Sequence, residues 1–224
     1  MAIGQRTSPA GVSVPSARAR SGRMRSGGPA GNELLTSATG AALLVLLLIL
    51  GVTIVQLRPL LWLHMFVGML LIGPVALKLA STGYRFTRYY TNSASYRSKG
   101  PPPALLRAIA PVMVIATVTV FATGVALLFA GPQSRSTLLP IHKISFFVWL
   151  AFTAPHVLAH LVNLPRALRS DYGHDSRLSS DVTGRTGRVL ALAGALVAGA
   201  VLAVLVIPEF APWIHSAGLF HHGG

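Results

Sequence analysis

The stretch LLPIHKISFFVWLAFTAPHVLAHL, residues Leu138–Leu161, is as long and apolar as a membrane-crossing helix, yet it contains ionisable residues. A helix needs about 20 mainly apolar residues to cross the hydrocarbon core of a bilayer. Ionisable side chains inside such a span are costly and usually have a function. The segment therefore raises the question of what these residues do: His142, Lys143, His156 and His160.

Composition indicates that the whole chain belongs in a membrane. Its 224 residues have a mean hydropathy of +0.61, and only 11% of them are charged. A soluble domain contains about 25% charged residues. The chain has no cysteine, which excludes disulfides, thiolate metal sites, iron–sulfur ligation and covalent haem attachment through cysteine. Any metal centre must therefore use nitrogen or oxygen ligands.

The apolar runs predict an all-α integral membrane protein with five transmembrane helices. The expected spans are about 34–57, 60–82, 104–130, 138–163 and 187–207. The first four should form a bundle, and the fifth carries a stripe of small residues that allows close packing on another helix: Ala191, Ala195, Gly199 and Ala203. The expected organisation is a disordered basic cytoplasmic tail, a membrane domain and an external tail, at residues 1–32, 33–210 and 211–224.

The basic residues predict the orientation of these spans. Lys and Arg gather in the N-terminal tail and in the connections after the second and fourth spans, whereas the other side has only Arg58, Arg135 and Lys143. The positive-inside rule then predicts a multi-pass protein of the plasma membrane with a cytoplasmic N-terminus and an external C-terminus. Because the positive charge flanks apolar runs, the net charge of +14 indicates topology and lipid contact rather than nucleic-acid binding.

Two spans carry nitrogen ligands at the same spacing. His64 and Lys78 lie in the second span, His142 and His156 in the fourth, and thirteen residues separate the members of each pair. Fourteen steps along a helix rise ~21 Å and return to within ~40° of the starting face. Both spans run from outside to inside, so His64 is level with His142 at the outer side, and Lys78 is level with His156 at the inner side.

This pattern is what two stacked haems require, because a six-coordinate haem takes axial ligands from two different helices. His156 and His160 lie four residues apart on one helix and cannot be the two ligands of one iron, so Lys78 is the available partner of His156. Lys78 either ligates as a neutral amine or extends to the cytoplasmic interface as a cation. The expected hydrogen-bond partners of a haem propionate are His160, Arg85 and Arg88, and the two arginines also fit contact with anionic lipid.

Two glycines are compatible with a flat macrocycle beside a helix. Gly68 lies one turn from His64, and Gly124 lies in the third span. Both also fit ordinary packing between helices, in which small residues are common.

Paired histidines thirteen residues apart on two helices of a bundle resemble the di-haem cytochrome b family, and the spacing is similar to that of the transmembrane ferric reductases. The resemblance covers about residues 34–163. It implies that His64 and His142 ligate one haem b through its iron and that His156 is one ligand of a second. Lys78 departs from the pattern, because the family has histidine at that place, and this puts the inner haem in question.

The leading functional hypothesis is a membrane cytochrome that passes electrons across the bilayer. Its donor and acceptor would be a quinone or a partner redox protein, so the chain is expected to be the membrane subunit of a redox complex rather than a complete enzyme. Two alternatives stay open. One is a transporter or proton relay through Lys78, His156 and His160, and the other is a structural or assembly subunit without chemistry.

Overall fold

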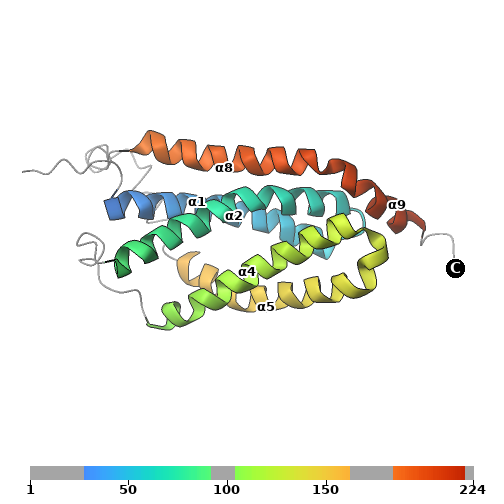
Figure 1. The fold of residues 1–224 in the computed structure, drawn as a ribbon, viewed down its shortest axis with the longest axis horizontal. Helices are drawn as coiled ribbons and strands as arrows, with labels where there is room; N and C mark the ends of the chain where they lie inside the picture. The colour runs from blue at the N-terminus through green and yellow to red at the C-terminus, as the bar shows by residue number, and fades with distance from the viewer. Residues whose placement is uncertain (1–27, 92–103, 162–183, 220–224) are drawn as a thin grey trace, which may run out of the picture.

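The computed structural model describes residues 28–91, 104–161 and 184–219, and among these residues there are helices and short connections but no strands (Figure 1). Five of the helices are long and apolar enough to cross a membrane. The chain is therefore an all-α, multi-pass integral membrane protein, as the apolar runs predict. The long helices are α1 Gly28–Val55, α2 Leu61–Tyr90, α4 Ala104–Ala130, α5 Arg135–Leu161 and α8 Arg185–Leu205.

Two boundaries differ from the predicted ones. Helix α1 begins at Gly28, inside the segment expected to be disordered, because Pro29 fits the first turn of a helix and Asn32 is held by a hydrogen bond from its Nδ2 to the Ser81 carbonyl (3.1 Å). The rest of that expected tail, residues 1–27, lies outside the described part of the chain.

Helix α2 continues to Tyr90, eight residues past the predicted end of its span. The aromatic rings of Phe86 and Tyr90, four residues apart, lie 4.5 Å apart between centroids, so one face of the extension has a stabilising pair. This extension replaces the first part of the connection that was predicted between the second and third spans. The loop segments 92–103 and 162–183 lie outside the described residues.

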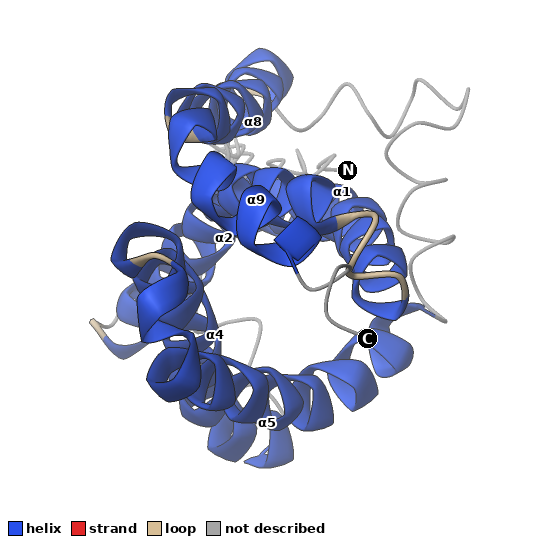
Figure 2. Cartoon of the chain, turned by 90° about the vertical axis from the view of Figure 1, so that its right-hand side faces the viewer, coloured by secondary structure: helices blue, strands red, loops and turns tan. Residues whose placement is uncertain are grey.

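The long helices form two hairpins, α1–α2 and α4–α5, and α8 packs against α2 and α1. Seen from the end, α1, α2, α4 and α5 are arranged around a common centre, with α8 outside them (Figure 2). Helix α5 packs against α4, and within the described residues it has no extensive backbone contact with α1 or α2. The second and fourth spans, which carry the predicted ligands, thus face each other without packing closely.

Helix α8 approaches α2 through two glycines. A Cβ atom at Gly73 would collide with the carbonyl oxygen of Ala195, and one at Gly199 would collide with the carbonyl oxygen of Leu70. Side chains larger than hydrogen are therefore excluded where the two helices cross. The predicted close packing of the small-residue stripe on another helix is confirmed.

An apolar core closes the end of the molecule at which α2 begins. It includes Met69, Leu128 and Phe210, which are buried where α2, α4 and the short helix η2 Ile207–Phe210 meet. Helix α9, Ala211–Leu219, follows directly, and Trp213 packs against this core. The segment after the fifth span, predicted to be a tail, therefore begins as an anchored helix, and its last residues, 220–224, lie outside the described part.

Candidate functional site

His64 lies in the first turns of α2 and is held by a threonine of α1. Its Nδ1 is 2.9 Å from the hydroxyl oxygen of Thr53, a residue that is completely buried near the end of α1. The same hydroxyl donates a hydrogen bond of 2.6 Å to the carbonyl oxygen of Leu50, in its own helix. The tight turn between α1 and α2 brings the two residues together, although eleven positions separate them.

His142 lies in the second turn of α5 and is held in the same way by α4. Its Nδ1 is 3.0 Å from the hydroxyl oxygen of Thr123, which donates to the carbonyl oxygen of Thr119 at 2.8 Å. Ser145 completes the group, because its hydroxyl lies 3.3 Å from that of Thr123 and donates to the His142 carbonyl oxygen. Each hairpin thus carries one histidine whose Nδ1 contacts a threonine of the preceding helix.

The two half-buried imidazoles lie within electrostatic range of each other. They come from helices that do not pack directly, and a Cβ atom at Gly68, one turn from His64, would meet no atom within 4 Å. Open space next to His64, two imidazoles and the separation of α2 from α5 would all fit a planar group held between the two histidines.

Gly124 lies against the ring of His142. A Cβ atom at this position would lie 3.2 Å from Cε1 of His142, so the missing side chain makes room for the imidazole ring itself. Of the two interpretations of Gly124, close packing between helices fits this contact, and a surface for a macrocycle stays a prediction.

At the inner level, the structure places Lys78 against α1. Its Nζ donates a 2.7 Å hydrogen bond to the carbonyl oxygen of Thr36, and Gly40 leaves the space in which the amine lies. The hydroxyl of Thr36 also contacts that of Ser81 at 3.2 Å, so this polar group joins α1 to α2. His156 is half-buried on α5, a helix that packs against α4. The ligation of an inner haem by Lys78 and His156 stays a prediction.

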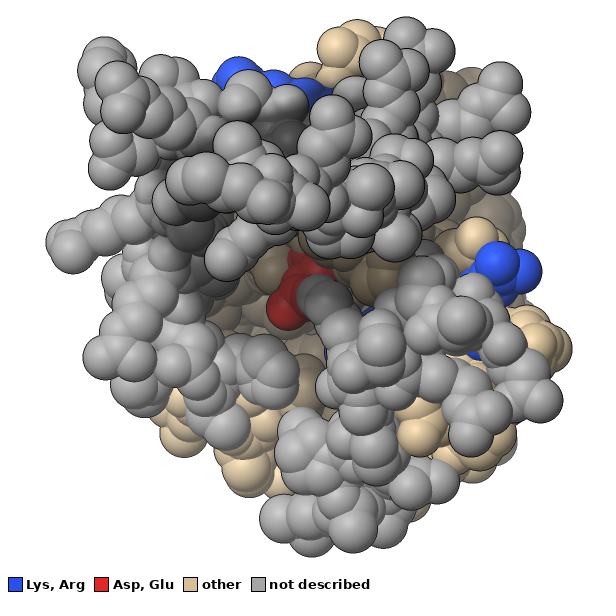
Figure 3. Space-filling model, turned by 90° about the vertical axis from the view of Figure 1, so that its left-hand side faces the viewer, with Lys and Arg blue, Asp and Glu red and all other residues tan. Residues whose placement is uncertain are grey.

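The predicted propionate partners lie at the same end of the molecule. Arg85 and Arg88 are exposed on the extension of α2, and His160 lies in the last turn of α5, where the structure does not describe its side chain. Figure 3 looks onto this end, where described Lys and Arg side chains lie near the rim. The positions of the arginines fit contact with lipid headgroups, and their pairing with a propionate stays a prediction.

Sequence reasoning missed the threonines that hold the two histidines. It also missed a second connection between α4 and α5, in which Nε1 of Trp149 donates to the hydroxyl oxygen of Thr117 at 3.1 Å. The polar residues of α5 share one side of the helix: His142, Ser145, Trp149, Thr153 and His156. Their spacing of three and four residues is the signal that could have found this face.

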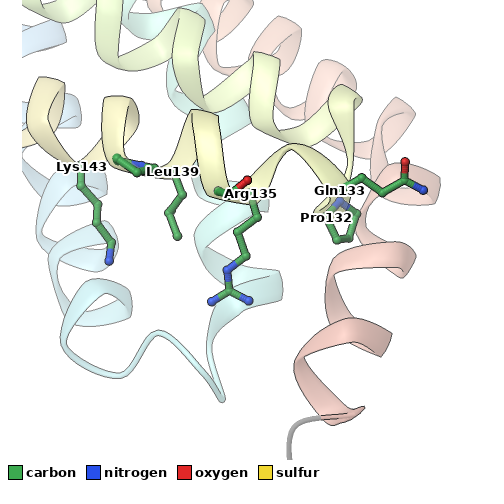
Figure 4. A pocket seen from close by; sticks show the side chains of 7 residues that line it. Pro132, Gln133, Arg135, Leu139 and Lys143 are labelled. Atoms are coloured by element: carbon green, nitrogen blue, oxygen red, sulfur yellow. The ribbon is translucent and has the colours of Figure 1, made fainter.

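A shallow depression lies at the start of α5, at the end of the molecule opposite the arginines of α2 (Figure 4). Arg135, Leu139 and Lys143 lie on successive turns along it, so the depression follows one surface of a single segment. We therefore assign it no ligand.

Comparisons with protein-family models, with curated proteins and with solved structures give no match. The class of the protein accordingly rests on its own structure, which is that of an all-α, multi-pass membrane protein.

Proposed function

We propose that the protein is a b-type membrane cytochrome in which His64 and His142 are the axial ligands of one haem. One observation carries the proposal: two imidazoles on facing hairpins each have Nδ1 engaged by a threonine, which leaves Nε2 as the ligating nitrogen. Metal-ligating histidines almost always use their second ring nitrogen in this way, because the outer hydrogen bond fixes the orientation of the ring.

The haem would supply one-electron redox chemistry, and its axial ligands and surroundings would set its reduction potential. The residues of this chain would hold and orient it: His64 and His142 as ligands, and Thr53 and Thr123 behind them. We further propose that electrons are exchanged with a quinone or a partner redox protein, and that the chain lies in the plasma membrane with its N-terminus in the cytoplasm.

A second haem, ligated by His156, extends the proposal to the inner level. Lys78 could serve as its other ligand only as the neutral amine, whose lone pair would bind the iron while an N–H donates to the Thr36 carbonyl oxygen as in this structure. The inner level therefore needs a deprotonated lysine, which the outer level does not, and we propose the outer haem as the primary cofactor.

The proposal is tested by the absorption spectrum and haem content of the protein purified in detergent. The wild type is expected to show a Soret band and to bind at least about one haem in a pyridine haemochrome assay. His64→Ala and His142→Ala should each remove about one haem equivalent while the protein still inserts into the membrane, since each leaves the iron with one axial ligand. The matched control is His215→Ala, because His215 is exposed on α9, and its haem content should equal that of the wild type. A wild type without a Soret band, or ligand variants with unchanged haem, would refute the proposal.

A further inference from the structure

The hydroxyl of Thr53 determines which ring nitrogen of His64 carries a proton. A threonine hydroxyl has one proton to donate and lone pairs to accept. The proton of Thr53 is directed to the Leu50 carbonyl oxygen at 2.6 Å, and a carbonyl oxygen can only accept. The 2.9 Å contact with His64 therefore has Nδ1–H as its donor and the threonine oxygen as its acceptor.

The same reasoning holds for His142. The proton of Thr123 is directed to the carbonyl oxygens of Thr119 and Val120, at 2.8 and 3.1 Å. The 3.0 Å contact between Thr123 and Nδ1 of His142 therefore also has the imidazole as its donor.

We propose that Thr53 and Thr123 are positioning residues that hold both histidines in the Nδ1–H tautomer, with the lone pair of Nε2 directed away from the threonines. This inference deepens the proposed function and rests on it. Only the unprotonated nitrogen can bind iron, so each threonine selects the ligating form of its histidine before the haem binds. After binding, the hydrogen bond that Nδ1–H donates to the threonine oxygen would increase the basicity of the imidazole and thereby lower the reduction potential of the iron.

The two threonines differ in how far neighbouring groups can replace them. Among the residues that the structure describes, Thr53 alone has a side chain that forms a hydrogen bond with the ring of His64. At His142, a second hydroxyl is at hand, because that of Ser145 lies 3.3 Å from that of Thr123. Removing the Thr53 hydroxyl should therefore have a larger effect on haem binding than removing the Thr123 hydroxyl.

The test compares Thr53→Val and Thr123→Val, which keep the side-chain shape, with Thr53→Ser and Thr123→Ser, which keep the hydroxyl. The valine variants are expected to bind haem about 10- to 100-fold more weakly, as is typical when the outer partner of a metal-ligating histidine is lost. The haem that they retain should have a more positive reduction potential. The serine variants should restore both properties.

Matched controls separate positioning from packing. Thr39 is completely buried in α1, like Thr53, but its described hydrogen bond goes to Leu35 of its own helix. Thr119 on α4 donates to Ile115 of its own helix. Thr39→Val and Thr119→Val should therefore leave haem affinity and potential unchanged. Equal potentials in Thr53→Val and the wild type would overturn the inference, as would serine variants that behave like the valine variants.

A measurement on the haem-free protein distinguishes failure of this inference from failure of the proposed function. Nitrogen NMR of imidazole-labelled apoprotein reports the tautomer of each histidine directly. It should show Nδ1–H for His64 and His142 in the wild type and a mixture of tautomers for His64 in Thr53→Val. A wild type without haem but with these tautomers refutes the cytochrome while leaving the role of the threonines intact. A mixture of tautomers in the wild type refutes that role even if haem binds.

Discussion

The crossing of α2 and α8 is expected to tolerate no added carbon, and Gly199→Ala tests this directly. The new Cβ would meet the carbonyl oxygen and carbon of Leu70, which are backbone atoms that cannot rotate away as a flexible side chain does. The helices must then separate along the whole crossing. Overpacking of a close-packed interior costs about 1–3 kcal/mol, and a clash with backbone should lie in the upper half of that range.

A matched control exists on the same helix. An added Cβ at Gly194 meets nothing within 4 Å, so Gly194→Ala gains the helix preference of alanine, about 0.5–1 kcal/mol, without a clash. Gly199→Ala receives the same gain, so the difference between the two variants isolates the clash. We expect Gly199→Ala to be less stable than Gly194→Ala by about 2–3 kcal/mol.

The assay is unfolding of the purified protein in detergent by increasing SDS, followed by circular dichroism at constant temperature. The double variant Gly73→Ala/Gly199→Ala adds a further check, because both glycines serve one crossing. Once the helices have separated for one Cβ, the second should cost much less than it does alone, which is strong non-additivity. If Gly199→Ala matches Gly194→Ala, or if the two crossing substitutions add independently, the reasoning about the crossing is wrong.

Three further predictions concern orientation, the inner level and the α4–α5 contact. In this cysteine-free chain, Ser95→Cys should resist an impermeant thiol reagent on intact cells while Gln133→Cys, exposed at the opposite end, should react; the reverse pattern would invert the topology. Lys78→Ala should leave the haem content unchanged if the amine only joins α2 to α1, whereas loss of a haem equivalent or a change in spin state would identify Lys78 as a ligand. Trp149→Phe should lower the free energy of unfolding by about 1 kcal/mol, because it removes one neutral hydrogen bond. Thr117→Val should then cost little more when it is added to Trp149→Phe. If Thr117→Val costs as much in the Trp149→Phe variant as in the wild type, the bond contributes nothing to stability.

The transmembrane framework could be predicted because it depends on length and apolarity alone. Runs of about 20 apolar residues leave the backbone no alternative to a helix within a bilayer. The ends of the helices lack this constraint. Past Ser81, the α2 sequence is polar and aromatic, and its helical continuation to Tyr90 depends on local contacts such as that between Phe86 and Tyr90. Composition does not distinguish such a segment from a loop.

The threonines behind the histidines could not be predicted for a different reason. A threonine in an apolar run usually bonds to its own helix, as Thr39 does, and nothing in its immediate sequence marks Thr53 as different. The difference arises from how the two helices of a hairpin are aligned. Thr53 and His64 are eleven positions apart and lie close to the turn 56–60, whereas Thr123 and His142 are nineteen positions apart because each lies about two turns inside its helix, on either side of the short connection 131–134.

The inner level shows why spacing alone cannot assign a ligand. His64 and Lys78 both contact α1, as expected for residues fourteen positions apart on one helix. An imidazole has two nitrogens, so His64 can bond to α1 through one and still present the other. A lysine has one nitrogen, and the Nζ of Lys78 donates to the Thr36 carbonyl oxygen; it can bind iron only as the neutral amine, which keeps its lone pair while an N–H donates. The same position on the helix therefore lets a histidine contact α1 through one nitrogen and present the other, whereas a lysine must use its single nitrogen for both, and ligation by Lys78 stays a prediction.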